Sequence, residues 1–317
     1  MKRHRPKVSI ILLNYNGFDD SLSCFQSLQK IRYVNYDVII VDNASPDASM
    51  DKFVAYMEDS EIEHFFFNTP ENAMNEPTYS SVSLIQSGFN GGYGYGNNIG
   101  IKYALINGAD FVLIINNDTV VDPAFLEPMV QMCEKDHRIG IASGKIYFYD
   151  RPDTFWFNGG KINQCTAKVE HFNFNEKDVG QNINEPVTFI SGCMWLIPKN
   201  IFKNVGFINE EYFMYVEDLE YCQRILNRGY TLKISNDTKI LHKVGGSSGL
   251  WSEFFAYWMA RNKMKFIGNF EKGLCLFSAY SYHIVYTSMW WLLHKRYDLF
   301  KSHIKGIWSV VAHKGND

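Results

Sequence analysis

A chain of 317 residues, of which 46% are hydrophobic and 21% charged, has the composition of a globular protein and is long enough for a sizeable core. Its formal net charge of −3 excludes an overall attraction to nucleic acid, so any basic surface must be local. Six scattered cysteines without a C-x-x-C pair favour reduced thiols over a disulfide framework or a zinc site. The apolar run at residues 8–13 is too short for a signal-peptide core, which predicts a cytoplasmic protein.

The first hundred residues alternate between strand and helix patterns. Apolar runs at residues 8–13 and 36–41 favour strands covered on both faces, with a helical stretch at residues 21–28 between them. Ligands of open parallel sheets bind beyond the carboxyl ends of the strands, so the polar residues that follow both runs are expected to face one site. For either turn alone, ordinary turn and capping chemistry is the more common explanation. These polar residues are Asn14, Asn16, Asp42 and Asn43.

A glycine-rich segment at residues 90–100 precedes a helical stretch at residues 101–107. Its backbone N–H groups are suited to lie against a phosphate, as at the start of many helices. The glycines do not form G-x-G-x-x-G directly after a strand, which disfavours a dinucleotide-binding dehydrogenase. The candidate ligand-binding residues of this segment are Asn90, Gly92, Asn97 and Asn98.

A third buried strand, expected at residues 111–115, delivers Asn117 and Asp118 to the same edge of the sheet. A carboxylate at this place can bind a hard divalent cation, which completes its coordination shell with phosphate oxygens and water. The alternative is that Asp118 only caps the short helix expected to start near residues 122–123. Because polar clusters end all these strands at one edge, the functional interpretation is favoured.

Together, these segments resemble the nucleotide-sugar half of the family-two glycosyltransferases with the GT-A fold. The subgroup that the chain most resembles contains bacterial rhamnosyltransferases and galactofuranosyltransferases of surface polysaccharide synthesis. The resemblance implies a doubly wound, mixed but mostly parallel α/β sheet, a nucleotide diphosphate sugar donor such as dTDP-rhamnose or a UDP-sugar, and a saccharide acceptor that is lipid-linked. It covers about residues 8–266 and is carried by residues 14–16, 42–45, 90–100, 116–118, 206–224 and 240–248.

Three features depart from the family pattern. The metal motif reads Asn-Asn-Asp at residues 116–118 where many relatives have Asp-x-Asp, which leaves one carboxylate and predicts weaker metal binding. Residues 68–81 look like an insertion whose role is open. Residues 151–185 carry no assigned motif, and the aromatics at residues 153–160 are expected to pack in the core rather than to flank an acceptor sugar.

An acidic pair, Glu217 and Asp218, begins a helix expected at residues 216–226. Carboxylates are favoured at a helix start by the dipole and the free N–H groups, so capping alone can explain the pair. Transfer with inversion, however, needs a general base within hydrogen-bond reach of the acceptor hydroxyl. In the resembled family the second acid is the base, which implies Asp218 here. Glu217 would hold the acceptor or the helix geometry.

His242 ends a strand-like run at residues 238–242 and precedes a Gly/Ser segment at residues 245–249. A lone histidine is usually structural, but imidazole is a good ligand for Mn²⁺ or Mg²⁺ beside a carboxylate and phosphates. The resembled family places a histidine here on the metal, so we pair His242 with Asp118. The cofactor expected from the resemblance is therefore Mg²⁺ or Mn²⁺, which would neutralise charge on the leaving diphosphate.

The tail differs in character from the rest of the chain. Residues 274–293 contain no Asp, Glu, Lys or Arg and have about the length of a membrane-spanning helix, although His283 at their centre argues against a full span. Residues 299–311 predict a basic amphipathic helix that lies in a membrane interface, or that packs on the catalytic domain or on a second subunit in a homodimer. Its expected apolar face consists of Phe300, Ile304, Ile307, Trp308 and Val311.

The sequence thus predicts a GT-A glycosyltransferase domain at residues 1–269, with a nucleotide-sugar half (1–120) and an acceptor half (121–269), followed by a helical membrane-associating or oligomerising tail at residues 270–317. The enzyme is expected in the cytoplasm, peripheral at the inner face of the cell membrane. Two other classes remain open: a nucleotidyltransferase or dehydrogenase on a similar sheet, and a non-catalytic module that binds sugar nucleotides.

Overall fold

The computed structural model describes residues 5–76, 80–181, 183, 185–244 and 251–312. The Gly/Ser segment at residues 245–249 and part of the apparent insertion lie outside these residues; the described part of the insertion includes a short helix. The strands are β1 (Val8–Asn14), β2 (Tyr36–Asp42), β3 (Phe65–Phe67), β4 (Val82–Gln86), β5 (Phe111–Asn116), β6 (Thr119–Val121), β7 (Ile139–Phe148), β8 (Phe155–Phe157), β9 (Gly160–Asn163), β10 (Lys168–His171), β11 (Met194–Pro198) and β12 (Thr231–His242).

The helices connect these strands and extend the chain beyond them. The first seven are α1 (Phe18–Leu28), α2 (Ser49–Asp59), α3 (Pro70–Asn75), α4 (Gly92–Ile106), α5 (Leu126–Lys135), α6 (Lys199–Asn204) and α7 (Glu217–Asn227). Those after the last strand are α8 (Glu253–Phe270), α9 (Gly273–Ser281), the π-helix η1 (Tyr282–Tyr286), α10 (Thr287–Leu293) and α11 (Tyr297–Val311).

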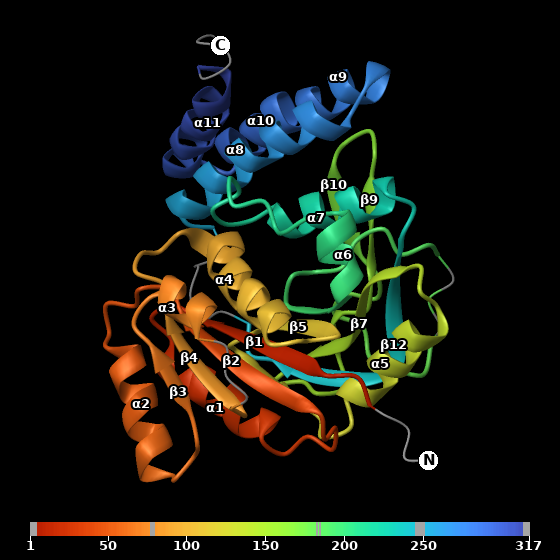
Figure 1. Ribbon diagram of the computed structural model, residues 1–317. Coiled ribbons are helices and arrows are strands. Elements are labelled where there is room, and N and C mark those ends of the chain that lie inside the picture. Colours follow the sequence, from red (N-terminus) through yellow and green to blue (C-terminus); the bar gives the residue numbers. More distant parts are fainter. Residues whose placement is uncertain (1–4, 77–79, 182, 184, 245–250, 313–317) are drawn as a thin grey trace.

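One large sheet organises the described residues, with the strand order β3-β4-β2-β1-β5-β11-β7-β12-β6 and β8 paired with β7. The first five strands of this order are parallel to one another, β11 is antiparallel to β5 and β7, and β12 is parallel to β7. The predicted mixed, mostly parallel α/β sheet is confirmed. β9 and β10 form a separate antiparallel hairpin, which rises from the sheet toward α9 (Figure 1).

The sheet is covered on both faces, as the continuous apolar strands predict. Val8 to Leu12 of β1 are all fully buried, which requires layers on either side. On one face α4 lies close to β1, because a Cβ at Gly96 would stand 2.3 Å from Leu13 Cδ1 and one at Gly100 would stand 2.8 Å from Ile11 Cγ2. These glycines set the distance between helix and sheet.

This packing corrects the interpretation of residues 90–100 as a loop before a helix at residues 101–107. Helix α4 begins at Gly92 and runs through most of the glycine-rich segment. Glycine normally weakens a helix, so the segment reads locally as a loop. Close contact with β1 stabilises the helical form, which a local pattern does not reveal.

Helices α8 to α11 form a layer at one end of the molecule, above the ends of α4 and α7 (Figure 1). Gly306 of α11 allows a close approach to α8, since a Cβ there would lie 2.3 Å from Tyr257 O. Ser302 of α11 also donates a 2.9 Å hydrogen bond to Glu253 of α8. Across the described part of the chain, we find no helix with both the length and the apolar character to span a membrane.

The apolar face predicted for α11 is only partly the buried one. Of its expected members, Ile307 is buried and Phe300 and Ile304 are half-buried, whereas Trp308 is 63% exposed and Val311 is 54% exposed. The close approach to α8 at Gly306 brings small and polar side chains into the buried face. The face that the structure buries consists of Leu299, Ser302, His303, Gly306 and Ile307.

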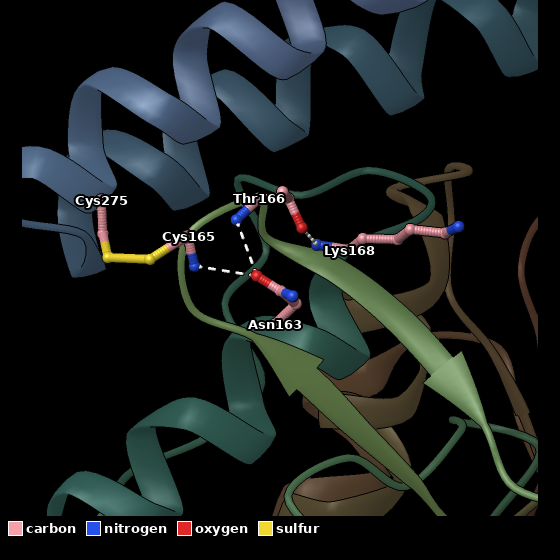
Figure 2. Close-up of a disulfide and its surroundings, with 5 residues drawn as sticks. All are labelled: Asn163, Cys165, Thr166, Lys168 and Cys275. Atoms are coloured by element: carbon pink, nitrogen blue, oxygen red, sulfur yellow. Dashed lines mark hydrogen bonds between the residues drawn. A yellow bond between two sulfur atoms is a disulfide. The ribbon is translucent and has the colours of Figure 1, made fainter.

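The expectation that all six cysteines are reduced is also wrong, because Cys165 and Cys275 form a disulfide. The two residues are 110 positions apart, so no spacing pattern links them. They meet because the turn of the β9–β10 hairpin lies against the start of α9 (Figure 2). The remaining cysteines, Cys24, Cys133, Cys193 and Cys222, are free and buried.

Candidate active site

The ends of β1 and β2 form a fixed polar cluster. Asn14 pairs with Asp42 in the strand register, and its Nδ2 donates to Asp42 Oδ1 at 2.7 Å and to Ser45 Oγ at 3.0 Å. Ser45 N donates to Asp42 Oδ2 at 3.0 Å. Ser21 donates to Asn14 Oδ1 at 2.7 Å and accepts from Asn117 Nδ2 at 2.9 Å. Asn14, Asp42 and Asn117 therefore lie in one network at the carboxyl edge of the sheet.

Two further candidates lie beside this network. Asn16 is exposed, and its backbone N–H donates to Ser45 Oγ at 2.8 Å. Asn43 Nδ2 donates to Asn90 Oδ1 at 2.9 Å and to Gly92 O at 3.1 Å, whereas its buried Oδ1 has no hydrogen-bond partner. Gly92 N donates to Asn90 Oδ1 at 3.0 Å, so this N–H is used within the chain rather than held free for a phosphate.

The start of α4 joins the strand-end cluster to the second half of the chain. Gly92 has a φ of +87°, and a Cβ there would lie 2.0 Å from the carbonyl oxygen of Phe213. That oxygen accepts a 2.9 Å hydrogen bond from Tyr93 N, and the Tyr93 hydroxyl donates to Gly192 O at 2.6 Å. Only glycine fits this contact between the two halves.

Asn97 and Asn98, the two asparagines of α4, face inward. Asn97 Nδ2 donates to Tyr93 O at 2.9 Å, and its buried Oδ1 has no partner. Asn98 donates to Ile208 O and to Glu210 Oε1, each at 2.8 Å, and accepts from Ile208 N at 3.1 Å. The Asn98 amide thus holds a loop of the chain's second half, and we do not propose that it binds the sugar nucleotide.

Asp118 and His242 meet where β5 and β12 end. His242 pairs with Thr119 in the register of β12 and β6, and its Nε2 lies 3.1 Å from Asp118 Oδ1. Neither that oxygen nor His242 Nδ1 has a hydrogen-bond partner of good geometry, although both atoms are buried. The His242 ring also packs edge-on against Trp156, with 4.3 Å between ring centroids.

A carboxylate and an imidazole that face each other, each with a buried atom that no described residue hydrogen-bonds, suit a divalent cation. Among the described residues, no group of three or more His, Cys, Asp or Glu side chains is arranged to hold a metal. Two protein ligands fit a cation that takes its other oxygens from a bound diphosphate and from water.

The acidic pair follows a strained turn. Tyr215 and Val216 have φ values of 67° and 74°, a conformation that costs a non-glycine residue about 1–3 kcal/mol. Asn262 of α8 holds this turn, because its Nδ2 donates to Met214 O and Tyr215 O, both at 2.9 Å. Glu217 then begins α7 as a buried side chain whose Oε2 has no hydrogen-bond partner. Strain and an unpaired buried carboxyl are frequent at functional sites.

The surroundings of the two acids shift their pKa values to different extents. Burial raises the pKa of Glu217 well above its usual range, and the neighbouring Asp218 raises it further. Burial also raises the pKa of Asp218, but the backbone N–H groups of Leu219 and Gly192 and the ammonium of Lys263 oppose this. Leu219 N donates to Asp218 Oδ1 at 2.8 Å. The surroundings therefore raise the pKa of Glu217 more strongly than that of Asp218, whose ionised form has stabilising partners.

A cavity of about 430 Å³ lies against this pair. Its walls come from β10, α7, α8, η1 and α10, so that the hairpin and the C-terminal helices enclose the acids. The volume is in the range of small-molecule sites. The lining is partly aromatic and partly basic, and includes Lys168, His171, Tyr215, Lys263, Tyr282 and His283.

Tyr93, Gly192 and Lys263 also belong to this site, although none of them is among the residues predicted from the sequence. Asn262 and Lys263 do carry a signal, because they share the buried face of α8 with Ala260 and Met264. Two adjacent polar residues on the buried side of a helix indicate specific partners. Tyr93 and Gly192 have no such signal, since their roles depend on a contact across 99 residues.

Comparison with known families agrees with the resemblance drawn from the motifs. Residues 9–206 match the family model described as Glycosyl transferase family 2. Residues 111–311 match a second model, described as Glycosyl transferase family group 2. The first match alone covers more than half of the chain.

Individual relatives are more distant. The dTDP-rhamnosyl transferase RfbF of Shigella flexneri is 31% identical over 168 residues, which are 53% of this chain and 54% of that protein. The low-salt glycan biosynthesis hexosyltransferase Agl10 of Haloferax volcanii is 23% identical over 226 residues, 68% of this chain and 61% of that protein. The chain thus matches only about half to three fifths of these relatives' lengths.

Solved structures show the same fold. The mannosyltransferase PcManGT from Pyrobaculum calidifontis, in complex with GDP-Man and Mn²⁺, has a TM-score of 0.58 at 13% identity and covers 98% of this chain, with 76% of its own length matched. GalNAc-T7 with UDP, GalNAc and Mn²⁺ has a TM-score of 0.59 at 13% identity, over 84% of this chain and 48% of its own. The fold is therefore GT-A, and the chain belongs to the family-two glycosyltransferases.

Proposed function

We propose that this protein transfers a sugar, with inversion, from a nucleotide diphosphate sugar to a hydroxyl of a saccharide. The observation that carries the proposal is the acidic pair of the buried Glu217 and the half-buried Asp218, on the wall of a cavity large enough for a sugar ring. An acid pair that only capped α7 would have no need of burial, because capping works at the protein surface. Burial makes sense for a carboxylate that must accept a proton.

The donor is proposed to bind at the strand-end cluster around Asn14 and Asp42, where Asn16, Asn43 and Asn117 also gather. The Asp42 carboxylate is held in place by three hydrogen bonds, which suits a group that recognises a nucleoside by its base or ribose hydroxyls. Two of the relatives are named as rhamnosyltransferases. We therefore propose dTDP-rhamnose as donor, with a UDP-sugar as the second choice.

Asp118 and His242 are proposed to hold Mg²⁺ or Mn²⁺. When bound, such a cation neutralises charge on the leaving diphosphate. The chain's own contribution is to present one carboxylate oxygen and one imidazole nitrogen 3.1 Å apart at the edge of the sheet. Each of the two solved neighbours contains Mn²⁺, which supports this assignment.

Asp218 is proposed as the general base. The N–H groups of Leu219 and Gly192 and the ammonium of Lys263 favour its ionised form, and it borders the cavity in which the acceptor hydroxyl would lie. Its Oδ1 is held by Leu219 N, and Gly192 N lies 3.4 Å from Oδ2. These contacts fix the direction in which the carboxylate accepts the proton. Glu217, in its neutral form, can donate a hydrogen bond to the acceptor.

The acceptor is proposed to be a lipid-linked saccharide of cell-surface polysaccharide synthesis. A relative from Mycobacterium tuberculosis, 24% identical over 199 residues, is named as an N-acetylglucosaminyl-diphospho-decaprenol L-rhamnosyltransferase. The C-terminal helices also expose large apolar side chains, which would place the enzyme against the cytoplasmic face of a membrane. These side chains are Leu274, Phe277, Val285, Tyr286, Met289, Leu293 and Trp308.

The family membership does not favour a dehydrogenase or a nucleotidyltransferase. Measurements of kcat distinguish the proposed enzyme from a module that binds sugar nucleotides without catalysis. Asp218→Asn keeps size and capping ability but cannot accept a proton, so kcat should fall by about 10² or more while donor binding persists. Glu217→Gln is the matched control and should harm the chemical step less, because Gln still donates a hydrogen bond.

The two variants are compared in transfer assays with a panel of nucleotide sugars. If Asp218→Asn retains near wild-type turnover and Glu217→Gln is inactive, the base is the other acid. If both variants keep their activity, the pair is a helix cap and the proposed mechanism is wrong.

A further inference from the structure

The turn of the β9–β10 hairpin is fastened to the C-terminal helices at three successive residues. The first is Cys165, through the disulfide with Cys275 (Figure 2). The next two are bound through their backbone carbonyls: His283 Nε2 donates to Thr166 O at 2.9 Å, and Lys263 Nζ donates to Ala167 O at 2.5 Å. A turn held by α8, α9 and η1 together cannot move independently of them. β10, which begins at the next residue, forms one wall of the cavity.

Lys263 differs from Cys275 and His283 because it brings a positive charge to the cavity that the acids line. Its side chain lines the cavity together with Glu217 and Asp218, although the residue is only 7% exposed. Its ammonium has three donors, and the structure shows a hydrogen bond from it to Ala167 O. A buried cation is costly unless an opposite charge and hydrogen bonds compensate it. Asp218 is the group that supplies this opposite charge.

Resting on the proposed role of Asp218 as base, we propose that Lys263 is a positioning residue for sugar transfer. Its ammonium holds the hairpin wall through Ala167 and places a positive charge opposite the Asp218 carboxylate. One side chain thereby supports the wall of the cavity and favours the ionised form of the base.

The charge of Lys263 changes near neutral pH. Burial lowers the pKa of this ammonium to about 8, against the opposing effect of Asp218. Lys263 is therefore charged below about pH 8 and loses its charge as the pH rises further. A neutral amine is a weaker hydrogen-bond donor to Ala167 O than an ammonium, so the hairpin wall loosens and transfer should slow on the alkaline side.

Other groups around the pair do not account for such a change. Burial lowers the pKa of His171 and that of His283, the latter to about 3, so both rings stay neutral at this pH. Burial raises the pKa of a tyrosine and two thiols near the pair, which moves their ionisation further away from pH 8. These are Tyr93 on α4, Cys193 just before β11 and Cys222 on α7. Burial also raises the pKa of Glu217, and the pH profile of Glu217→Gln separates its titration from that of Lys263. Lys168 on β10 also lines the cavity and is a cation on the hairpin side.

The test is the pH profile of kcat for three variants of Lys263. Lys263→Gln can still donate to Ala167 O but lacks the charge, Lys263→Met lacks both, and Lys263→Arg keeps a charge that does not titrate in this range. The control is Lys265→Gln, on the same helix, which removes an ion pair with the exposed Glu211 at 2.6 Å. Donor affinity and thermal unfolding are measured in parallel, to identify any variant that fails to fold.

For the wild type and the control, kcat should fall as the pH rises through about 8. Lys263→Gln should have kcat lowered about tenfold at neutral pH, no alkaline limb, and an acidic limb moved to higher pH by about one unit. Lys263→Met should add a rise in acceptor KM, because the hairpin wall is released. Lys263→Arg should lose the alkaline limb and keep the acidic limb of the wild type.

Two results would overturn the proposal. One is a uniform loss of kcat with the wild-type pH profile in the Gln variant, which is the signature of a packing role alone. The other is an Arg variant whose acidic limb moves to higher pH although its charge is kept. If the neutral variants do not fold, the comparison of the Arg variant with the wild type decides. Failure of the base assignment is recognised separately, by wild-type turnover of Asp218→Asn.

Discussion

Replacing Gly92 by alanine should destabilise the protein more than the same change at Gly88. Both glycines have a left-handed backbone, with φ of +87° and +85°. Alanine in this region costs about 1–2 kcal/mol at either position. A Cβ at Gly88 would meet nothing within 4 Å, whereas one at Gly92 would lie 2.0 Å from Phe213 O and 2.7 Å from Phe213 C.

The contact at Gly92 cannot relax at little cost. Its partner is backbone, and the carbonyl of Phe213 already accepts a 2.9 Å hydrogen bond from Tyr93 N. Displacing a packed group of this kind costs about 1–3 kcal/mol in addition to the backbone term. The expected loss is therefore roughly 2–5 kcal/mol for Gly92→Ala and roughly 1–2 kcal/mol for Gly88→Ala.

Thermal and denaturant unfolding of the two variants measure this difference. For domains of this size, each kcal/mol lowers Tm by about 2–4 °C, so the two variants should separate clearly. Gly92→Ala should also weaken binding of the donor nucleotide, because Asn43 donates to the carbonyl of Gly92. Equal destabilisation of the two variants would show that the close approach between α4 and residue 213 has no energetic weight.

Three further predictions follow from the proposed site. Asp42→Ala should weaken nucleotide binding, measured by calorimetry, without lowering the unfolding temperature to a comparable extent; unchanged affinity would remove Asp42 from the donor site. Turnover should require Mg²⁺ or Mn²⁺, so full activity in excess chelator, or in Asp118→Ala/His242→Ala, would contradict the metal assignment. The protein should co-sediment with anionic liposomes at low salt, and Leu274→Ser/Phe277→Ser should weaken this; no sedimentation of the wild type would favour a dimer interface instead.

The strand-end cluster can be predicted from sequence because its geometry follows from one local pattern. Residues 8–13 and 36–41 are apolar throughout, and each run stops at a polar residue. Parallel pairing in register brings the polar ends of the two strands together, so that Asn14 Nδ2 lies 2.7 Å from Asp42 Oδ1. The same reasoning places Asp118 at this edge, since β5 is the other neighbour of β1.

The glycine-rich segment shows where a local pattern misleads. Glycine has low helix propensity, so residues 90–100 read as a loop. In the fold, Gly96 and Gly100 are selected by the distance between α4 and β1, and Gly92 by the distance to Phe213. All three distances depend on how distant segments of the chain pack together, and the local sequence pattern does not show this packing.

The acidic pair Glu217 and Asp218 shows the same limit of local patterns at the proposed catalytic site. From sequence alone, Glu217 and Asp218 are as well explained by capping as by catalysis, because both interpretations need acids at the start of a helix. Enclosure in the cavity favours the proposed catalytic role, and α8, η1 and α10 supply much of this enclosure, through residues about 40 to 70 positions further along the chain. The tail that the sequence predicts as a separate membrane-associating or oligomerising extension therefore also encloses the proposed base. If its exposed apolar face binds a membrane, the same helices that contact lipid on one side form the wall of the acceptor cavity on the other. A lipid-linked sugar would then reach Asp218 from the membrane side without leaving the bilayer.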